Sequence, residues 1–368
     1  MADIDVNEDF NPQEFRDKQE SKKESDLITM KIHPEIWDEL GVRDPEQIKL
    51  ETAIMKKTRQ IKKELRTDPD NSEKQIELAT LYIDGGNYED AIKMLRGVIS
   101  KDSKNPRAYK VIGTAYALSK QEDEAILELN RAAELDPEDI ETHFNLGGVY
   151  MLQDSFGNAE REFKRVVELD PSDTTAYANL AAAYTMQKNH LEEIRTLKKV
   201  LMFDPENKEL RSALSNAYFH LGDFDESLTS ALCVIELDEK GPQAHCNLGS
   251  IYSAQNMVEE AIQSFQKAIE MDPEYSLPHT NLGSLYGTVG RVESAIKEFK
   301  KATSLNPGDA HAWLNLYHSY KEIGRPEDST KAFQKYEMLT KETAPGGGKA
   351  EFSGVPGGVS TTGDTASE

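Results

Sequence analysis

The sequence has few cysteines and no long apolar run. Cys233 and Cys246 are the only cysteines among 368 residues, which is too few for a disulfide framework and favours a reducing compartment. The first ten residues, MADIDVNEDF, are acidic and contain no apolar run, so they do not resemble a secretory signal. No stretch approaches the roughly 18 apolar residues that a membrane-spanning helix needs. We therefore expect a cytoplasmic protein that does not insert into a membrane.

Patterns that carry catalysis are also missing. The sequence has no glycine-rich phosphate-binding loop, no Ser/His/Asp arrangement with a strand-to-helix elbow, and no Cys or His cluster spaced for a metal ion. His143, His245 and His279 lie at equivalent positions of a repeat, where stacked helices roughly 8–10 Å apart would keep them from sharing one metal ion. A packing role is therefore expected for these histidines. The sequence predicts no catalytic residue, no metal and no cofactor.

Basic residues are in the minority. The 43 Lys and Arg against 66 Asp and Glu give a formal net charge of −23. An acidic surface repels phosphate backbones and anionic lipid headgroups. Nucleic acids and membrane surfaces are therefore poor partners for this chain.

What the sequence does have is a repeat of 34 residues. An aliphatic residue stands four positions before a tyrosine in every period, followed by a small residue in seven periods of eight, with Tyr317 as the exception. A second small residue follows nine positions after the tyrosine, except at Glu193, and a proline closes most periods. The tyrosines are Tyr82, Tyr116, Tyr150, Tyr184, Tyr218, Tyr252, Tyr286 and Tyr320. A phased period of this length indicates stacked supersecondary units.

These residues resemble the tetratricopeptide repeat family, whose unit is two antiparallel helices joined by a turn. The resemblance covers residues 72–343 and implies an all-α, right-handed superhelical solenoid of eight units with an N-terminal capping helix. Glycines at the predicted turns, such as Gly86 and Gly222, can end the first helix of a pair. The second helix is expected to bury one large residue in seven of the eight units, such as Phe163 or Phe333. Glu193 replaces the small residue of the fourth unit, which predicts a weak joint there.

The segments that flank the repeats differ from them in composition. Residues 1–27 are predicted to be a disordered acidic N-terminus, and residues 344–368 a flexible tail rich in Gly, Ser and Thr. Residues 28–69 are interpreted as a linker followed by a basic helix at 50–66. That helix is either a cap on the first repeat or a docking site for an acidic partner. The last helix either covers itself with polar residues or forms a homo-oligomer through the solenoid ends.

Asparagines recur on the first helices, which line the concave surface in the family that the chain resembles. Their carboxamides could bind both the N–H and the C=O of an extended peptide. The flanking residues, such as Ala178 and Ser250, are small and uncharged, which favours a closely approaching chain. The row resembles the asparagines in the tetratricopeptide superhelix of O-linked N-acetylglucosamine transferase. The predicted peptide-binding residues are Asn145, Asn179, Asn216, Asn247, Asn281 and Asn315.

A second binding mode of the family, a clamp for the C-terminal carboxylate of a chaperone, fits less well. Lys110 and Asn145 match the start of that pattern, but Thr114, Thr175 and Asn179 replace the residues that would complete it. Two functions stay open. One is a non-catalytic scaffold or adaptor that binds an extended or helical segment of client proteins. The other is a substrate-selecting, non-catalytic subunit of a multiprotein enzyme such as a protein glycosyltransferase.

Overall fold

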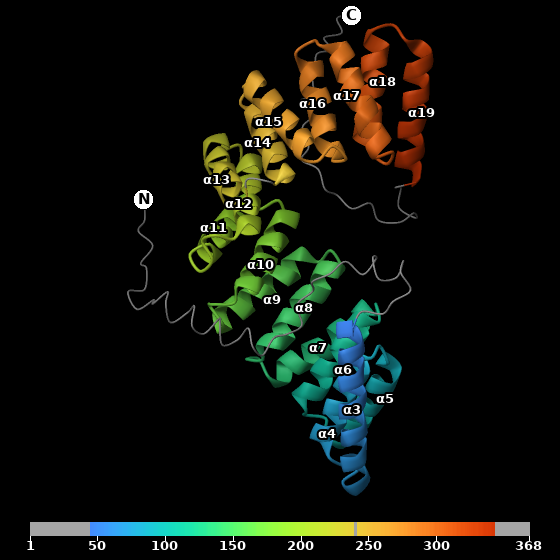
Figure 1. Ribbon diagram of the computed structural model, residues 1–368. Helices are drawn as coiled ribbons and strands as arrows, with labels where there is room; N and C mark the ends of the chain where they lie inside the picture. Colours follow the sequence, from blue (N-terminus) through green and yellow to red (C-terminus); the bar gives the residue numbers. More distant parts are fainter. Residues whose placement is uncertain (1–44, 239–240, 343–368) are drawn as a thin grey trace, which may run out of the picture. The chain divides into compact units, whose positions relative to one another are not determined.

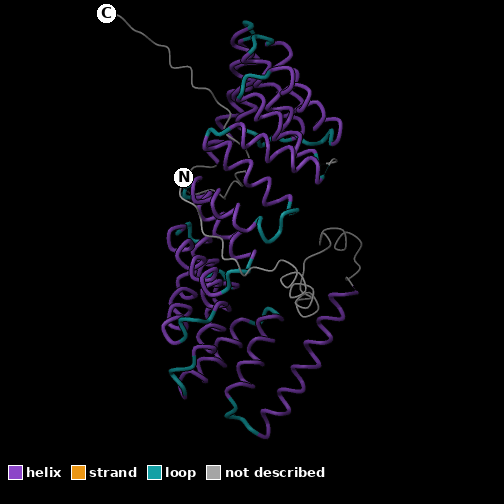
Figure 2. Tube along the Cα trace, turned by 90° about the vertical axis from the view of Figure 1, so that its left-hand side faces the viewer, coloured by secondary structure: helices purple, strands orange, loops and turns teal. Residues whose placement is uncertain are grey.

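The computed structural model describes residues 45–238 and 241–342, and these residues form helices with no strand among them (Figures 1 and 2). The predicted disordered segment 1–27, most of the predicted linker and the predicted tail 344–368 lie outside the described residues. The helices are α3 (Pro45–Thr67), α4 (Ser72–Asp84), α5 (Tyr88–Lys101), α6 (Pro106–Leu118), α7 (Glu122–Leu135), α8 (Ile140–Leu152), α9 (Phe156–Leu169), α10 (Thr174–Met186), α11 (His190–Val200), α12 (Lys208–Leu221), α13 (Phe224–Leu237), α14 (Pro242–Ala254), α15 (Val258–Met271), α16 (Ser276–Thr288), α17 (Val292–Leu305), α18 (Ala310–Glu322) and α19 (Pro326–Glu342).

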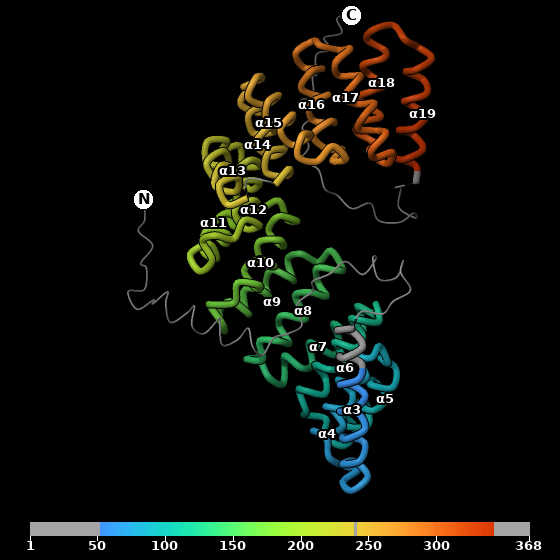
Figure 3. Tube along the Cα trace, in the orientation of Figure 1, coloured from blue at the N-terminus to red at the C-terminus, as the bar shows by residue number. Residues whose placement is uncertain are grey.

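Contacts between Cα atoms divide the chain into two compact units, Met1–Gln187 and Lys188–Glu368. We call them unit 1 and unit 2 and describe each separately; Figure 3 follows the chain through both. The boundary falls in the turn between α10 and α11, inside the fourth repeat. The sequence predicted a single solenoid of eight repeats, and it also predicted a weak joint in this repeat. Glu193 is 3 % exposed there and its Oε2 lies 2.9 Å from His190 Nδ1, so a buried carboxylate stands where other repeats have a small residue.

Capping residues explain why the first helices start and end where they do. They act through a side chain at the start and through the backbone conformation at the end. An Asn or Asp precedes most of them and accepts a hydrogen bond from a backbone N–H of the first turn, as Asn105 does from Ala108 and Asp139 from Thr142. Such a cap contributes roughly 1 kcal/mol. The helices end in a left-handed turn residue, which is glycine at Gly222 (φ 84°) but lysine at Lys120 (φ 61°). The sequence therefore predicted the glycine turns but not the others.

The small residue of each first helix lets the second helix approach closely. A Cβ added at Gly147 would lie 2.6 Å from Phe163 Cε1, and one added at Gly113 would lie 2.5 Å from Leu129 Cγ. Real Cβ atoms are not found so close to a neighbour, so the site has room for hydrogen only. The large residue of the second helix fills the space instead, and Phe163 is 1 % exposed.

The last repeat departs from this arrangement. Tyr317 occupies the small position of α18, and its ring centroid lies 4.9 Å from that of Phe333 on α19. Phe333 is 36 % exposed, whereas Phe163, Phe265 and Phe299 are at most 2 % exposed. The prediction that the second helix buries Phe333 is therefore wrong, because a tyrosine fills the space that a small residue leaves open in other repeats.

The phased tyrosines connect successive repeats. In several cases the residue 20 positions earlier, on the second helix of the preceding repeat, contacts the tyrosine ring or hydroxyl. Lys164 Nζ lies 5.6 Å from the centre of the Tyr184 ring, Lys198 Nζ lies 5.3 Å from that of Tyr218, and Arg96 Nη2 donates to Tyr116 Oη at 3.4 Å. A cation over an aromatic face contributes about 0.5–1 kcal/mol at an exposed site. This spacing explains part of the tyrosine phasing.

Helix α3 packs against α4 in unit 1 (Figure 1). Ile61 is 2 % exposed and contacts Leu78 and Leu81, with Ile54 and Leu65 beside them. Lys62 Nζ lies 5.1 Å from the centre of the Tyr82 ring, and Lys57 pairs with Glu77. These contacts favour the cap over the docking site, although Lys56, Arg59, Lys63 and Arg66 stay exposed on the outer side of α3.

Candidate functional site

The first helices of neighbouring repeats touch one another within each unit. In unit 1, α4 contacts α6 and α6 contacts α8; in unit 2, α12 contacts α14, α14 contacts α16 and α16 contacts α18. Second helices do not approach each other as closely anywhere among the described residues. The first helices therefore form the inner face of each unit, as the resemblance implies.

The predicted asparagines all belong to first helices and all are half-buried. Asn145 and Asn179 belong to unit 1, whereas Asn216, Asn247, Asn281 and Asn315 belong to unit 2. The structure thus forms two rows, one in each unit. No contact here tests whether a peptide binds them, so their role as peptide ligands stays a prediction.

Three of these asparagines form the same hydrogen bond to the preceding repeat. Asn145 Nδ2 donates to Thr114 Oγ1 at 3.1 Å, and Asn281 and Asn315 donate to Ser250 Oγ and Ser284 Oγ at 3.3 Å each. The hydroxyl lies 31 residues before the asparagine in every case. This bond fixes the amide plane. Within the described part of the chain, the Oδ1 atoms of these three asparagines receive no side-chain or backbone donor.

The sequence interpretation missed these hydroxyl partners, although their spacing was visible. It treated Thr114 as a departure from a clamp pattern and Asn216 as a member of the asparagine row. In the repeat frame Asn216 is equivalent to Thr114, Ser250 and Ser284, and it precedes Asn247 by 31 residues. For Asn179 the equivalent residue is Gly148, which has no side chain to accept a bond.

Lys110, the residue that best matched a carboxylate clamp, is already engaged. Its Nζ lies 3.2 Å from Asp139 Oδ2 and also pairs with Glu141. The side chain is 14 % exposed. A lysine held by two carboxylates of its own chain is poorly placed to bind a third, which agrees with the poor match of the sequence to the clamp pattern.

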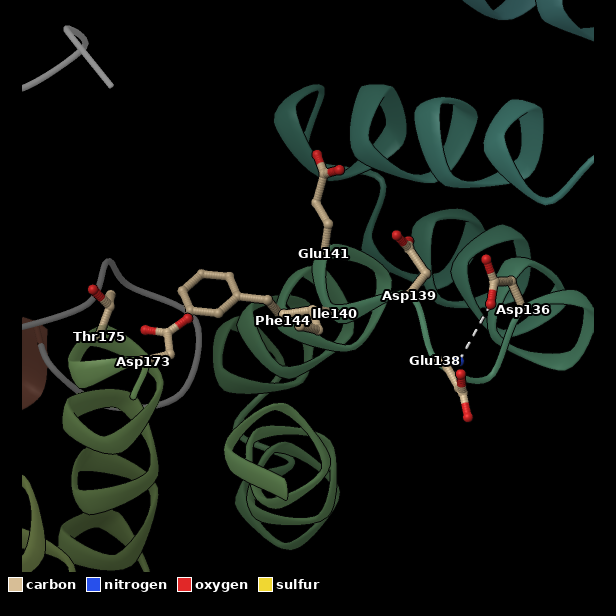
Figure 4. Close-up of a pocket in the computed structure, with 8 residues that line it drawn as sticks. All are labelled: Asp136, Glu138, Asp139, Ile140, Glu141, Phe144, Asp173 and Thr175. Atoms are coloured by element: carbon tan, nitrogen blue, oxygen red, sulfur yellow. Dashed lines mark hydrogen bonds between the residues drawn. The ribbon is translucent and has the colours of Figure 1, made fainter. Parts of the chain in front are cut away.

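An open pocket of about 830 Å³ lies beside this lysine in unit 1. It is lined by Phe144 and by five carboxylates from the starts of α8 and α10 and the turns before them (Figure 4). In the close-up, Phe144 projects between Glu141 on one side and Asp173 with Thr175 on the other. The sequence had predicted small, uncharged neighbours for the asparagines; at this end of unit 1 they are aromatic and acidic. The other carboxylates of the lining are Asp136, Glu138 and Asp139.

Two of the three equivalent histidines form buried pairs with glutamates. His143 Nδ1 lies 2.7 Å from Glu162 Oε2, and His279 Nδ1 lies 2.7 Å from Glu298 Oε2. His143 also lies 3.1 Å from the carbonyl oxygen of Pro137 through Nε2. His143 is 9 % exposed and His279 6 % exposed. Both are packed inside the repeat, and no group of three His, Cys, Asp or Glu residues in the described ranges could hold a metal ion.

The His143–Glu162 pair should make stability depend on pH. The hydrogen bond that His143 donates to the Glu162 carboxylate raises the pKa of His143 above 6.5, against the effect of burial. Burial would raise the pKa of Glu162, but its hydrogen bonds with His143 and Arg161 outweigh burial and hold the pKa below 4.5. The stabilisation by His143 is complete below about pH 6.5 and is lost as pH rises through the pKa of the folded state. The stabilisation by Glu162 is lost as pH falls through the lowered pKa of Glu162 in the folded state.

We therefore expect His143→Gln to lower the free energy of unfolding by roughly 1–2 kcal/mol more at about pH 5.5 than at about pH 8.5. Urea unfolding of the wild type and the variant at both pH values measures the difference. In a Glu162→Gln background the same substitution should lose this pH dependence. An equal cost at the two pH values in the wild-type background would show that the pair does not titrate in this range.

Four family models match the chain, and each is described as a tetratricopeptide repeat. They cover residues 76–140, 116–184, 242–275 and 278–309. The chain is a tetratricopeptide repeat protein. Together with the paired helices, the matches show an all-α repeat solenoid. Proteins of this family generally serve as scaffolds that bind other proteins.

No curated protein matches the tetratricopeptide chain. Among solved structures, it is similar to MamA at 26 % identity, over 45 % of this chain and 96 % of that one, with a TM-score of 0.39. It is similar to YrrB, described as a TPR protein with an unusual peptide-binding site, at 18 % identity over 50 % and 95 % of the two chains, with a TM-score of 0.45. It is also similar to a chain of the APC/C hetero-tetramer Cut9–Hcn1, at 16 % identity over 75 % of this chain and 54 % of that one, with a TM-score of 0.48.

None of the described helices of this tetratricopeptide protein is both long and apolar enough to span a membrane.

Proposed function

We propose that this tetratricopeptide repeat protein is a non-catalytic scaffold whose inner face binds an extended or helical segment of client proteins. The observation that supports it best is the repeated bond of Asn145, Asn281 and Asn315 to a hydroxyl of the preceding repeat. At Asn145 and Asn315 the bond uses one amide N–H and leaves Oδ1 and the second N–H for a ligand. Asn281 Nδ2 also donates to Cys246 Sγ at 3.7 Å, so Oδ1 is the atom that Asn281 leaves for a ligand. A row of fixed carboxamides suits the regularly spaced N–H and C=O groups of a peptide backbone.

The proposed binding mode reads the backbone rather than a particular side chain. A client N–H would donate to an asparagine Oδ1, and a client C=O would accept from the remaining amide N–H of Asn145 or Asn315. Because the carboxamides are already oriented by Thr114, Ser250 and Ser284, little side-chain entropy is lost on binding. Side-chain specificity would then come from the residues beside the row, which differ between the two units.

The alternative, a substrate-selecting subunit of a multiprotein enzyme such as a protein glycosyltransferase, would use the same inner face. Catalysis would then belong to another polypeptide. The cytoplasmic location, the lack of nucleic-acid partners, the lack of enzymatic activity, the domain limits and a homo-oligomer through the solenoid ends stay predictions from the sequence.

Peptide selection followed by substitution of single asparagines tests the proposal. A phage-displayed library of random peptides would be panned on the full chain, and the affinity of the selected peptides measured by fluorescence anisotropy. We expect Asn145→Ala, Asn281→Ala or Asn315→Ala to weaken binding by about 0.5–1.5 kcal/mol for peptides that occupy the corresponding unit. Gln266→Ala, which removes an exposed carboxamide from second helix α15, is the matched control and should have no effect. Selected peptides that bind all four variants as tightly as they bind the wild type would contradict the proposal.

A further inference from the structure

Unit 1 exposes a row of large apolar side chains at the ends of three successive first helices. Leu118, Leu152 and Met186 lie 34 residues apart and are 53 %, 57 % and 54 % exposed. Leu152 and Met186 each follow an asparagine of the row, Asn145 or Asn179, by seven residues. Seven residues are close to two full turns of a helix, so each pair lies on one side of its helix about 10 Å apart. The apolar row therefore runs parallel to the asparagines.

The acidic pocket borders the other side of the same asparagines. Phe144 directly precedes Asn145 on α8 and lines the pocket together with the carboxylates of Glu138, Glu141 and Asp173 (Figure 4). Lys110 is the cation that pairs with Asp139 and Glu141. Five lining carboxylates against this one lysine leave the pocket strongly negative. The inner face of unit 1 thus has three bands, which are acidic with Phe144, then carboxamide, then apolar.

Unit 2 does not repeat this pattern. The residues that correspond to Leu118, Leu152 and Met186 are His220, Ala254, Thr288 and Glu322. None of them is a large apolar residue. The combination is therefore not required by the repeat itself, and packing does not explain three side chains that are more than half exposed.

The order of the bands indicates which ligand fits. An extended peptide directs alternate side chains to opposite sides of its backbone. With its backbone on the carboxamides, one set of side chains would face the carboxylates and Phe144, and the other set would face Leu118, Leu152 and Met186. Charge complementarity requires the first set to be basic, and a Lys or Arg also binds favourably to the face of Phe144. The second set must be apolar.

We propose that the inner face of unit 1 binds extended peptide segments in which basic and apolar side chains alternate. This inference rests on the proposed function and names the chemistry of the client. An acidic segment and a nucleic acid are excluded by the carboxylates, and a basic segment without apolar residues leaves the apolar row uncovered.

Four labelled peptides of eight residues test the proposal by fluorescence anisotropy on the full chain. They have the sequences KLKLKLKL, KKKKLLLL, KSKSKSKS and ELELELEL. We expect the alternating Lys/Leu peptide to bind at least about ten-fold more tightly than each of the others at about 50 mM NaCl, and its affinity to fall at about 300 mM. Equal binding of the alternating and blocked peptides would overturn the proposal, because only non-specific attraction to an acidic protein would then be measured.

Two pairs of variants locate the site. Glu138→Gln/Glu141→Gln removes charge from the pocket, whereas Glu89→Gln/Glu124→Gln removes the same charge from exposed positions on second helices α5 and α7. Leu118→Ser/Leu152→Ser removes two of the three members of the apolar row, whereas Leu127→Ser changes an even more exposed leucine, at 68 %, on α7. We expect a loss of about ten-fold for each inner-face variant and less than about two-fold for each control. Equal losses within either pair would overturn the proposal.

The result separates this inference from the proposed function. If Asn145→Ala weakens the selected peptides but the inner-face charge and leucine variants do not, a backbone-binding row exists and the alternating pattern is wrong. If Asn145→Ala has no effect on any peptide, the proposed function itself fails for unit 1.

Sedimentation velocity adds one further check. Concentration-dependent dimers abolished by Glu138→Gln/Glu141→Gln would show that the exposed basic side of α3 in a second copy occupies the face, which would overturn the proposal of a client.

Discussion

Phe163→Ala is expected to lower the free energy of unfolding of unit 1 by about 3–5 kcal/mol. Phe163 is 1 % exposed and belongs to a core with Leu146, Leu180 and Tyr184. Its ring also meets Phe144 edge to face, with centroids 5.8 Å apart. The substitution removes this contact and leaves a cavity between α8, α9 and α10. In a solenoid each repeat packs only on its neighbours, so a distant repeat cannot compensate for the loss.

Phe333→Ala is the matched control for this experiment. Phe333 occupies the same position of the last repeat but is 36 % exposed, so its removal should cost about 1 kcal/mol. Urea unfolding followed by circular dichroism measures both variants. In a Trp37→Phe background the fluorescence of Trp313 reports on unit 2, which distinguishes the two units. Equal costs for the two phenylalanines would contradict the packing described for α8 and α9.

Gly147→Ala should destabilise the protein by about 1–3 kcal/mol, although alanine favours helices. The added Cβ would lie 2.6–2.8 Å from three atoms of the Phe163 ring, and the ring is confined by the core around it. Either the ring leaves its preferred position or α8 and α9 separate. Both changes reduce the contact between the helices of the third repeat.

The adjacent residue provides the control. A Cβ at Gly148 would meet nothing within 4 Å, so Gly148→Ala should stabilise the helix by about 0.5–1 kcal/mol through helix propensity alone. The two variants have the same composition and lie one residue apart, and we expect opposite signs in thermal or urea unfolding. A stabilising effect of Gly147→Ala would show that the helices have room to separate without cost.

The sequence predicted the features that repeat. The phased small residues predicted the close approach at Gly147, the glycine turns predicted the end of α12 at Gly222, and the shared position of His143 and His279 predicted buried histidines. Each of these depends on local geometry within a 34-residue unit, so one period contains the information. Glu193 was singled out for the same reason, because a charged residue at a packed position breaks the pattern.

The features that the sequence did not predict involve residues of different repeats or different ends of a helix. The bond from Asn145 to Thr114 joins positions 31 residues apart, and the contact of Lys164 with Tyr184 joins positions 20 apart. Neither spacing equals the 34-residue period of the repeat. The pocket around Phe144 combines two turns and two helix starts, so only the three-dimensional arrangement brings its carboxylates together. Phe333 was predicted to be buried but is exposed, because Tyr317 on α18 fills the space that a small residue leaves open in other repeats.

The binding role of the inner face is tested most directly by photo-crosslinking. A photoreactive phenylalanine derivative would replace Gly148 on α8, where a side chain meets open space four residues from both Phe144 and Leu152, or Gly157 on second helix α9, where space is also open. We predict that a peptide selected for binding to unit 1 is crosslinked at position 148 and not at position 157. Crosslinking at 157 alone, or equally at both positions, would contradict a binding face formed by the first helices.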